Sequence, residues 1–131
     1  MQNHDNKLTV VFVYGTLKKH DCRSYLMDGS IFLGEAVTDA KYQLYNLGSY
    51  PGLVETDFSA GVSVQGELYA VTDECLLRLD QEEGVADGLY ERRKVQLLPP
   101  HAEVATEAYF YLLGLGDAED IGTRWNSAQP T

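Results

Sequence analysis

Three carboxylates crowd residues 79–84, whose sequence is Leu-Asp-Gln-Glu-Glu-Gly. The stretch ends a helix predicted to start at Asp73, so these side chains lie where the helix dipole disfavours negative charge by roughly 0.3–1 kcal/mol each. Two interpretations follow from the pattern. Either the residues form a solvated acidic loop, with Arg78, Arg92 and Arg93 close enough in sequence to offset the charge, or one carboxylate is held at a pocket as a general acid/base.

A second candidate for chemistry is the turn that follows a buried, β-branched strand at residues 8–14. Gly15 can adopt backbone conformations closed to other residues and lets backbone N–H groups approach a ligand, while Thr16 adds a hydroxyl. Such a turn can cradle an anion. The alternative is an ordinary strand exit with no ligand.

Other catalytic templates do not fit the sequence. His4, His20 and His101 share no short ligand spacing, so we expect no metal site. The phosphate-binding and dinucleotide-binding glycine motifs are absent, and we expect no cofactor. Residues 61–65 (Gly-Val-Ser-Val-Gln) miss the last glycine of the serine-nucleophile elbow.

The elements that must position these residues are mostly strands. The apolar patterns predict a central strand covered on both faces, further strands, and a helix capped by Thr72 with Cys75, Leu76 and Leu79 on its inner face. The predicted strands are residues 8–14, 31–37, 41–47, 53–55, 63–71, 90–98 and 105–113; the predicted helices are 73–81 and a short helix or turn at 22–27.

Length and composition predict one domain covering residues 1–131, with a core at about 8–113 and a C-terminal arm or tail at 114–131. The net charge of -10 argues against nucleic-acid or membrane partners. Cys22 and Cys75 do not form a disulfide framework, and no apolar leader or membrane span is visible, which favours a cytoplasmic location. The oligomeric state stays open.

The order and spacing of several segments resemble the gamma-glutamyl cyclotransferase-like family. The resemblance covers about residues 8–113 and rests on five segments, which are Val13–Lys18 (Val-Tyr-Gly-Thr-Leu-Lys), the Gly48–Leu53 turn, Gly66–Tyr69, Leu79–Glu83 and Leu89–Arg92. It implies an α+β fold, a small mixed β-barrel with a few flanking helices, which agrees with the strand-rich pattern.

The resemblance also implies a reaction. The α-amino group of a small gamma-glutamyl substrate attacks its own gamma-carbonyl and releases 5-oxoproline and an amine. The family's acid/base glutamate corresponds to Glu83, and its substrate-binding loop corresponds to Tyr14, Gly15, Thr16 and Leu17. The ring closure is intramolecular, so it needs neither metal nor cofactor.

We expect three further tyrosines, Tyr50, Tyr90 and Tyr111, to bind substrate. On a strand, Tyr109 and Tyr111 share one face while Phe110 takes the other, so either the tyrosine pair or Phe110 should enter the core. We expect the Tyr111 hydroxyl at the pocket wall with a partner, because a buried tyrosine needs one. Plain core packing is the alternative.

One departure from the family concerns Glu82, since many relatives have an aromatic residue there. This neighbour would raise the pKa of Glu83 by like-charge repulsion, or it places the motif one residue out of register. We predict that Glu83 points into the cavity beside the Gly15 turn and Glu82 points outward. The competing hypotheses are a non-catalytic small-molecule-binding or interaction module, and a purely structural domain with no such pocket.

Overall fold

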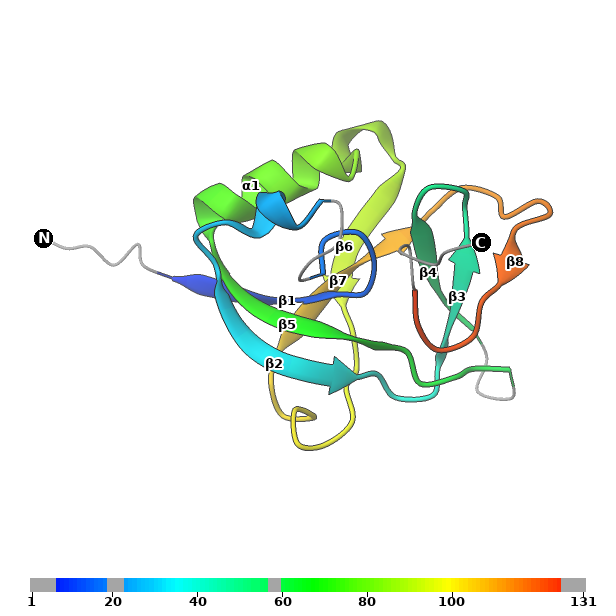
Figure 1. Cartoon of the computed structure of the whole chain (residues 1–131), viewed down its shortest axis with the longest axis horizontal. Coiled ribbons are helices and arrows are strands. Elements are labelled where there is room, and N and C mark those ends of the chain that lie inside the picture. The colour runs from blue at the N-terminus through cyan, green and yellow to red at the C-terminus, as the bar shows by residue number, and fades with distance from the viewer. Residues whose placement is uncertain (1–6, 19–22, 57–59, 126–131) are drawn as a thin grey trace, which may run out of the picture.

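A curled eight-stranded sheet forms the framework, and its central strand β1 (Leu8–Val13) leads directly into the Gly15 turn (Figure 1). The computed structural model describes residues 7–18, 23–56 and 60–125. The strands follow the order β2-β5-β1-β7-β4-β3-β8, and β6 pairs with β7. The other strands are β2 (Ile31–Val37), β3 (Tyr42–Asn46), β4 (Pro51–Glu55), β5 (Gln65–Thr72), β6 (Tyr90–Lys94), β7 (Thr106–Tyr111) and β8 (Glu119–Asp120). The predicted α+β fold with a curled, barrel-like sheet is confirmed.

The predicted helix is α1 (Asp73–Glu82), and it covers one side of the sheet (Figure 1). The Thr72 hydroxyl accepts a hydrogen bond from the backbone N–H of Cys75 at 3.1 Å, which caps the first turn. Cys75 and Leu79 are buried, as the pattern predicted, and Leu76 is partly buried. Within the described residues the other helices are two short 3-10 turns, η1 (Ser24–Met27) and η2 (Val85–Asp87).

Strand β1 is covered on both faces because its side chains alternate between two apolar clusters. Phe12 enters the cluster that fills the curled sheet with residues of β3 and β4. Val11 and Val13 enter a second cluster beneath α1 and η1. Both clusters are closed to solvent, so the end of β1 is fixed from two sides and the turn after it has a defined position.

Strand β7 marks the place where the sheet divides. One edge of β7 pairs with β6 along its length. The other edge pairs in parallel with β1 at its start, through Val10 and Val11, and with β4 further on, through Leu53 and Phe110. The turn after β1 and the start of β4 therefore meet where these two strands diverge.

Both faces of β7 are buried, which corrects the prediction that either the tyrosine pair or Phe110 would enter the core. Phe110 belongs to the cluster inside the curled sheet, and Tyr109 belongs to the cluster under α1. Tyr111, at the end of the strand, is only partly buried. Alternation along a strand cannot choose a core face when helix and sheet cover both faces.

The C-terminal segment packs on the curled sheet as far as Trp125, which is buried, so the prediction of a free arm or tail is wrong up to this residue. Strand β8 pairs with β3, and Trp125 is buried in the cluster inside the curled sheet. The backbone N–H of Gln65 donates to the Thr123 carbonyl at 2.7 Å. Short polar segments carry little periodicity, so the sequence alone did not indicate this packing.

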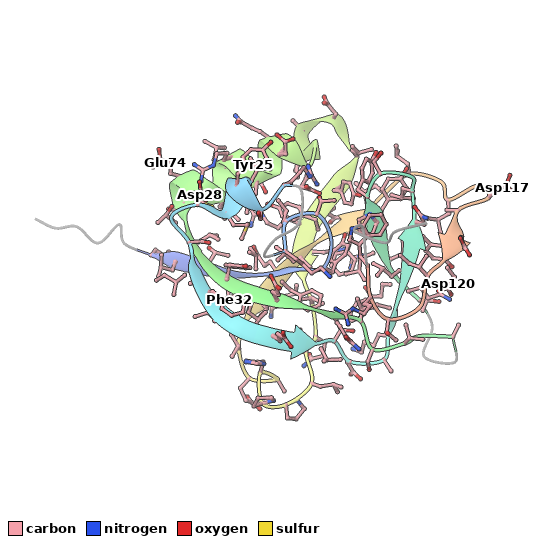
Figure 2. The ribbon with its side chains drawn as sticks, viewed as in Figure 1. Tyr25, Asp28, Phe32, Glu74, Asp117 and Asp120 are labelled. Atoms are coloured by element: carbon pink, nitrogen blue, oxygen red, sulfur yellow. The ribbon has the colours of Figure 1, made fainter. Side chains whose placement is uncertain are left out.

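Acidic side chains lie at both ends of the molecule. Asp28 and Glu74 lie beside the start of α1, and Asp117 and Asp120 lie at β8 (Figure 2). None of the described helices has the length and apolar character needed to cross a bilayer. His4, His20 and Cys22, which the sequence analysis weighed, lie outside the described residues.

Candidate active site

A small cavity lies where the turn after β1 meets the end of α1. It holds about 20 Å³ of open space, enough for about one water molecule, and it adjoins a shallower depression of about 70 Å³. Its walls come from segments far apart in sequence. The lining residues are Phe12, Val13, Tyr14, Gly15, Thr16, Leu17, Arg23, Tyr50, Pro51, Glu83, Tyr90 and Tyr109.

Gly15 is required by the close approach of β4. A side-chain Cβ at this position would lie 2.5 Å from Cγ of Pro51, well inside contact distance. Gly15 is not among the glycines with a positive φ, so its role is steric clearance rather than the special backbone conformation expected from the sequence. The Pro51 ring packs directly against the turn and holds it in place.

The backbone N–H groups of the turn have no acceptor among the described residues. Thr16 and Leu17 are buried, and Gly15 is buried with them. Within the part of the chain that the structure describes, no residue accepts a hydrogen bond from the backbone N–H groups of these three. Buried N–H groups without an acceptor are costly, so a turn that keeps several of them at a cavity is suited to bind a carbonyl oxygen or an anion.

Glu83 follows α1 directly and faces this cavity. It is 6% exposed as a residue, whereas the side chain of Glu82 is 43% exposed. Its Oε2 accepts a hydrogen bond from Nη2 of Arg23 at 2.7 Å. Glu83 therefore faces the cavity beside the Gly15 turn, as predicted. Glu82 is more exposed but does not simply point away, because it lines the adjoining depression and lies 3.5 Å from Arg23.

The carboxyl of Glu83 is a stronger base than an exposed glutamate. Burial raises its pKa above the ordinary value, the ion pair with Arg23 opposes the rise, and the like charge of Glu82 adds to it. The predicted effect of Glu82 is present, but desolvation is the larger cause. A carboxylate with a raised pKa accepts a proton near neutral pH more readily, as a general acid/base requires.

Arg23 is the site residue that the sequence analysis missed. Its Nε donates to the Thr16 hydroxyl at 2.7 Å, and its backbone N–H donates to the Thr16 carbonyl at 2.8 Å. One guanidinium therefore ties the turn after β1 to Glu83 and, at 3.5 Å, to Glu82. The residue stands alone in a polar stretch, 60 positions before its partner, and no local pattern marks it.

The three arginines expected to offset the acidic stretch at residues 79–84 each contact a different group. Arg92 makes a two-point contact with Asp80, at 2.9 and 3.0 Å. Arg78 donates to the carbonyls of η1 and the residue after it, and Arg93 pairs with Glu55 on the surface. Only one of the three therefore contacts a carboxylate of this stretch among the described contacts.

Three buried tyrosines line the cavity, and each has a hydrogen-bond partner. Tyr14 donates to the Tyr109 carbonyl at 2.6 Å, which joins the end of β1 to β7. Tyr90 donates to the Pro51 carbonyl at 2.8 Å. Tyr109 donates to Oδ1 of Asp80 at 2.7 Å. Burial raises the pKa of all three, so they remain neutral donors.

Of the other two tyrosines predicted to bind substrate, Tyr50 lies at the cavity and Tyr111 does not. Tyr50 lines the cavity beside Pro51. Tyr111 packs edge-on against Tyr90, with ring centroids 5.4 Å apart, and it is Tyr109 rather than Tyr111 that reaches the cavity wall. The predicted position of Tyr111 is thus corrected: it shares the face of Tyr109 but lies at the end of β7, where it packs against Tyr90 and is only partly buried.

The sequence profile of the family described as gamma-glutamyl cyclotransferase, AIG2-like, matches residues 11–127. The chain belongs to this family. All residues that line the cavity fall inside the matched segment. The gamma-glutamyl cyclotransferase-like assignment inferred from the motifs is therefore confirmed at the level of the family.

Individual relatives give the same result. A relative from Vibrio cholerae is 43% identical over 76 residues, which cover 58% of this chain and 63% of that protein, so the match spans less than two thirds of its length. A relative from Methanocaldococcus jannaschii is 35% identical over 119 residues, 84% of this chain and 95% of that one. The crystal structure of an AIG2-like protein from Mus musculus is similar with a TM-score of 0.77 at 26% identity, covering 94% of this chain and 91% of that chain.

The groups that line the cavity come from side chains and from the backbone of the turn after β1. Among the described residues, no group of three or more His, Cys, Asp or Glu side chains is arranged to hold a metal ion. The cavity instead combines one buried carboxylate, one guanidinium and a row of backbone N–H groups. These groups can bind a zwitterion and move a proton.

Proposed function

We propose that the protein is a gamma-glutamyl cyclotransferase in which Glu83 is the general acid/base. The observation that carries the proposal is the position of Glu83. A buried carboxylate with a raised pKa faces the same cavity as the turn after β1, whose backbone N–H groups have no acceptor in the described part of the chain.

The proposed reaction begins with the α-ammonium group of the substrate at the Glu83 carboxylate. Glu83 takes a proton, and the α-nitrogen attacks the gamma-carbonyl carbon to form a five-membered ring. The bond from that carbon to the leaving nitrogen then breaks. Glu83 returns that proton to the leaving nitrogen, and the ring nitrogen loses a second proton as the lactam forms. An alkylamine product takes up this second proton as its ammonium ion, so 5-oxoproline and the amine are formed with no net gain or loss of protons.

The backbone amides of Gly15, Thr16 and Leu17 suit the developing charge on the gamma-carbonyl oxygen. Such donors act best where water is excluded and where they need not reorganise during the reaction. Both conditions are favoured here, since the turn is buried and Pro51 packs against it. The intramolecular attack already holds the reacting atoms together, which further lowers the demand on the protein.

The direct test is release of 5-oxoproline. Purified protein would be incubated with a panel of L-gamma-glutamyl amines, dipeptides and anilides, and 5-oxoproline and the free amine would be quantified by mass spectrometry. Equal amounts of both products from the L-compounds, and none with heat-denatured protein, would support the proposal. Saturable binding of these compounds without either product would favour the non-catalytic binding module instead.

A further inference from the structure

A gamma-glutamyl substrate carries two charges besides its reacting carbonyl. Under the proposed function, the α-ammonium lies at Glu83 and the carbonyl oxygen lies at the amides of the turn. The α-carboxylate still needs a partner, because a buried anion without one is strongly unfavourable. This inference rests on the proposed function and concerns the group that binds that carboxylate.

Among the described residues that line the cavity and the adjoining depression, Arg23 is the only basic one. About a quarter of its side chain is exposed, so a ligand in the cavity can reach it. The guanidinium is also held in a fixed position. Thr16 accepts from its Nε, and Glu83 and Glu82 lie on its two terminal nitrogens.

The hydrogen-bonding capacity of Arg23 exceeds these contacts. A guanidinium has five N–H donors, and the three described contacts use one on each nitrogen. One N–H on each terminal nitrogen can still be donated. The planar group matches a carboxylate in a two-point geometry, which a lysine ammonium cannot reproduce.

The charges at the site allow this arrangement. Glu82 and Glu83 carry two negative charges against the single positive charge of Arg23. A zwitterionic glutamyl group adds no net charge but rearranges the pairs. Its ammonium takes the Glu83 carboxylate, and its carboxylate takes the guanidinium.

We propose that Arg23 binds the α-carboxylate of the gamma-glutamyl substrate and thereby selects substrates in which this carboxylate is free. Because Arg23 is anchored to Thr16, it also fixes the α-carbon relative to the amides that hold the gamma-carbonyl. In the substrate-free site the same guanidinium pairs with Oε2 of Glu83. Binding of the substrate carboxylate weakens that pair and leaves Glu83 to act on the ammonium.

The test combines a substrate change with a residue change. Steady-state rates would be measured with L-gamma-glutamyl-p-nitroaniline and with its α-carboxamide analogue, since both release a coloured amine. For the wild-type protein we expect kcat/KM to favour the free carboxylate by about 10- to 100-fold, the range of a charge-assisted hydrogen bond. In Arg23→Gln this preference should fall below about threefold, with most of the loss for the carboxylate substrate appearing in KM.

Two further variants make the result specific. Arg23→Lys keeps the charge and should recover part of the preference but not all of it. Arg93→Gln removes an arginine that pairs with Glu55 on the surface, and it should leave the preference unchanged. Circular dichroism and thermal unfolding would verify that each variant is folded. A purely structural role for Arg23 would lower the rates with both substrates equally.

The outcomes separate this inference from the proposed function. Full preference retained in Arg23→Gln, or no preference in the wild-type protein, would overturn the role of Arg23 while leaving the cyclotransferase activity in place. If the wild-type protein released 5-oxoproline from no compound of the gamma-glutamyl panel, the proposed function would fail. Calorimetric titration with 5-oxoproline and its carboxamide would then test the role of Arg23. Tighter binding of the acid than of the carboxamide, lost in Arg23→Gln, would support this role. Any other result would overturn it.

Discussion

Replacing Glu83 with glutamine isolates the proton transfer from the other properties of this side chain. Glutamine has nearly the same size, and its carbonyl oxygen can accept the hydrogen bond that Arg23 donates at 2.7 Å. The turn after β1 should therefore stay in place, because the link from Arg23 to Thr16 does not involve the altered group. What is lost is the basicity of a carboxylate whose pKa is raised by burial.

The expected size of the effect follows from general acid/base catalysis. Such a group typically contributes 10²- to 10⁴-fold, which corresponds to about 3–5 kcal/mol of barrier. For Glu83→Gln we expect this loss in kcat, with KM changed by less than about threefold. The assay is initial-rate release of 5-oxoproline across substrate concentration.

Glu82→Gln is the matched control, because it changes the neighbouring carboxylate and leaves the cavity wall intact. Its removal lowers the pKa of Glu83 by taking away a like charge. The base is active when ionised, so the acid limb of the pH–rate profile should move to lower pH while kcat at its plateau changes by less than about tenfold. Small, equal effects of both substitutions would refute the assignment of Glu83, and a large loss in Glu82→Gln alone would mean that the motif is one residue out of register.

Three further predictions concern the supports of the site. Gly15→Ala should lower kcat/KM by about 10- to 100-fold in the same assay, because the added Cβ would meet Pro51 at 2.5 Å and shift the turn; an unchanged rate would show that the close packing is dispensable. Asp80→Asn should cost about 1–3 kcal/mol of unfolding free energy in urea at pH 7, and the difference should shrink as the pH falls through the lowered pKa of Asp80, below its ordinary 3.8. Trp125 is the only tryptophan, so native emission should be blue-shifted and should move to the red with the same denaturant midpoint as circular dichroism; a solvated native spectrum would contradict its burial.

The sign of the Asp80 prediction follows from its partners. Burial alone would raise the pKa of Asp80, but hydrogen bonds from Arg92 and Tyr109 outweigh it and the pKa is lowered. The folded state then holds fewer protons than the unfolded chain in this range. The stabilisation is fully present above the unfolded pKa and is lost as the pH falls through the folded one.

The sequence predicted those parts of the site that depend on local pattern. A buried β-branched strand ending in Gly-Thr, and a capped helix ending in carboxylates, are both visible in single stretches of sequence. Together with the order of the family motifs they were enough to bring the Gly15 turn and Glu83 to one cavity. Side chains on one face of a strand or of a helix recur at a fixed spacing. A single stretch of sequence therefore indicates both the element and its buried face.

The parts that sequence did not predict depend on contacts between distant segments. Arg23 pairs with Glu83 across 60 positions, and nothing in its own neighbourhood distinguishes it from a surface arginine. Tyr109 rather than Tyr111 reaches the cavity, although both lie on one face of β7, because Tyr111 at the end of the strand packs against Tyr90. Trp125 joins the core through single hydrogen bonds and one short strand, which leave no periodic trace.

The acidic end of α1 is explained by the residues that surround it. Asp80 and Glu83 are three positions apart, so they project from the same side of the helix end. Asp80 is held by Arg92 from β6 and by Tyr109 from β7, and Glu83 is held by Arg23. The unfavourable interaction of these carboxylates with the helix dipole is thus offset by two guanidiniums from elsewhere in the chain. The two carboxylates therefore have different roles. Asp80, whose pKa is lowered, fixes the helix end to the sheet. Glu83, whose pKa is raised, remains able to exchange a proton.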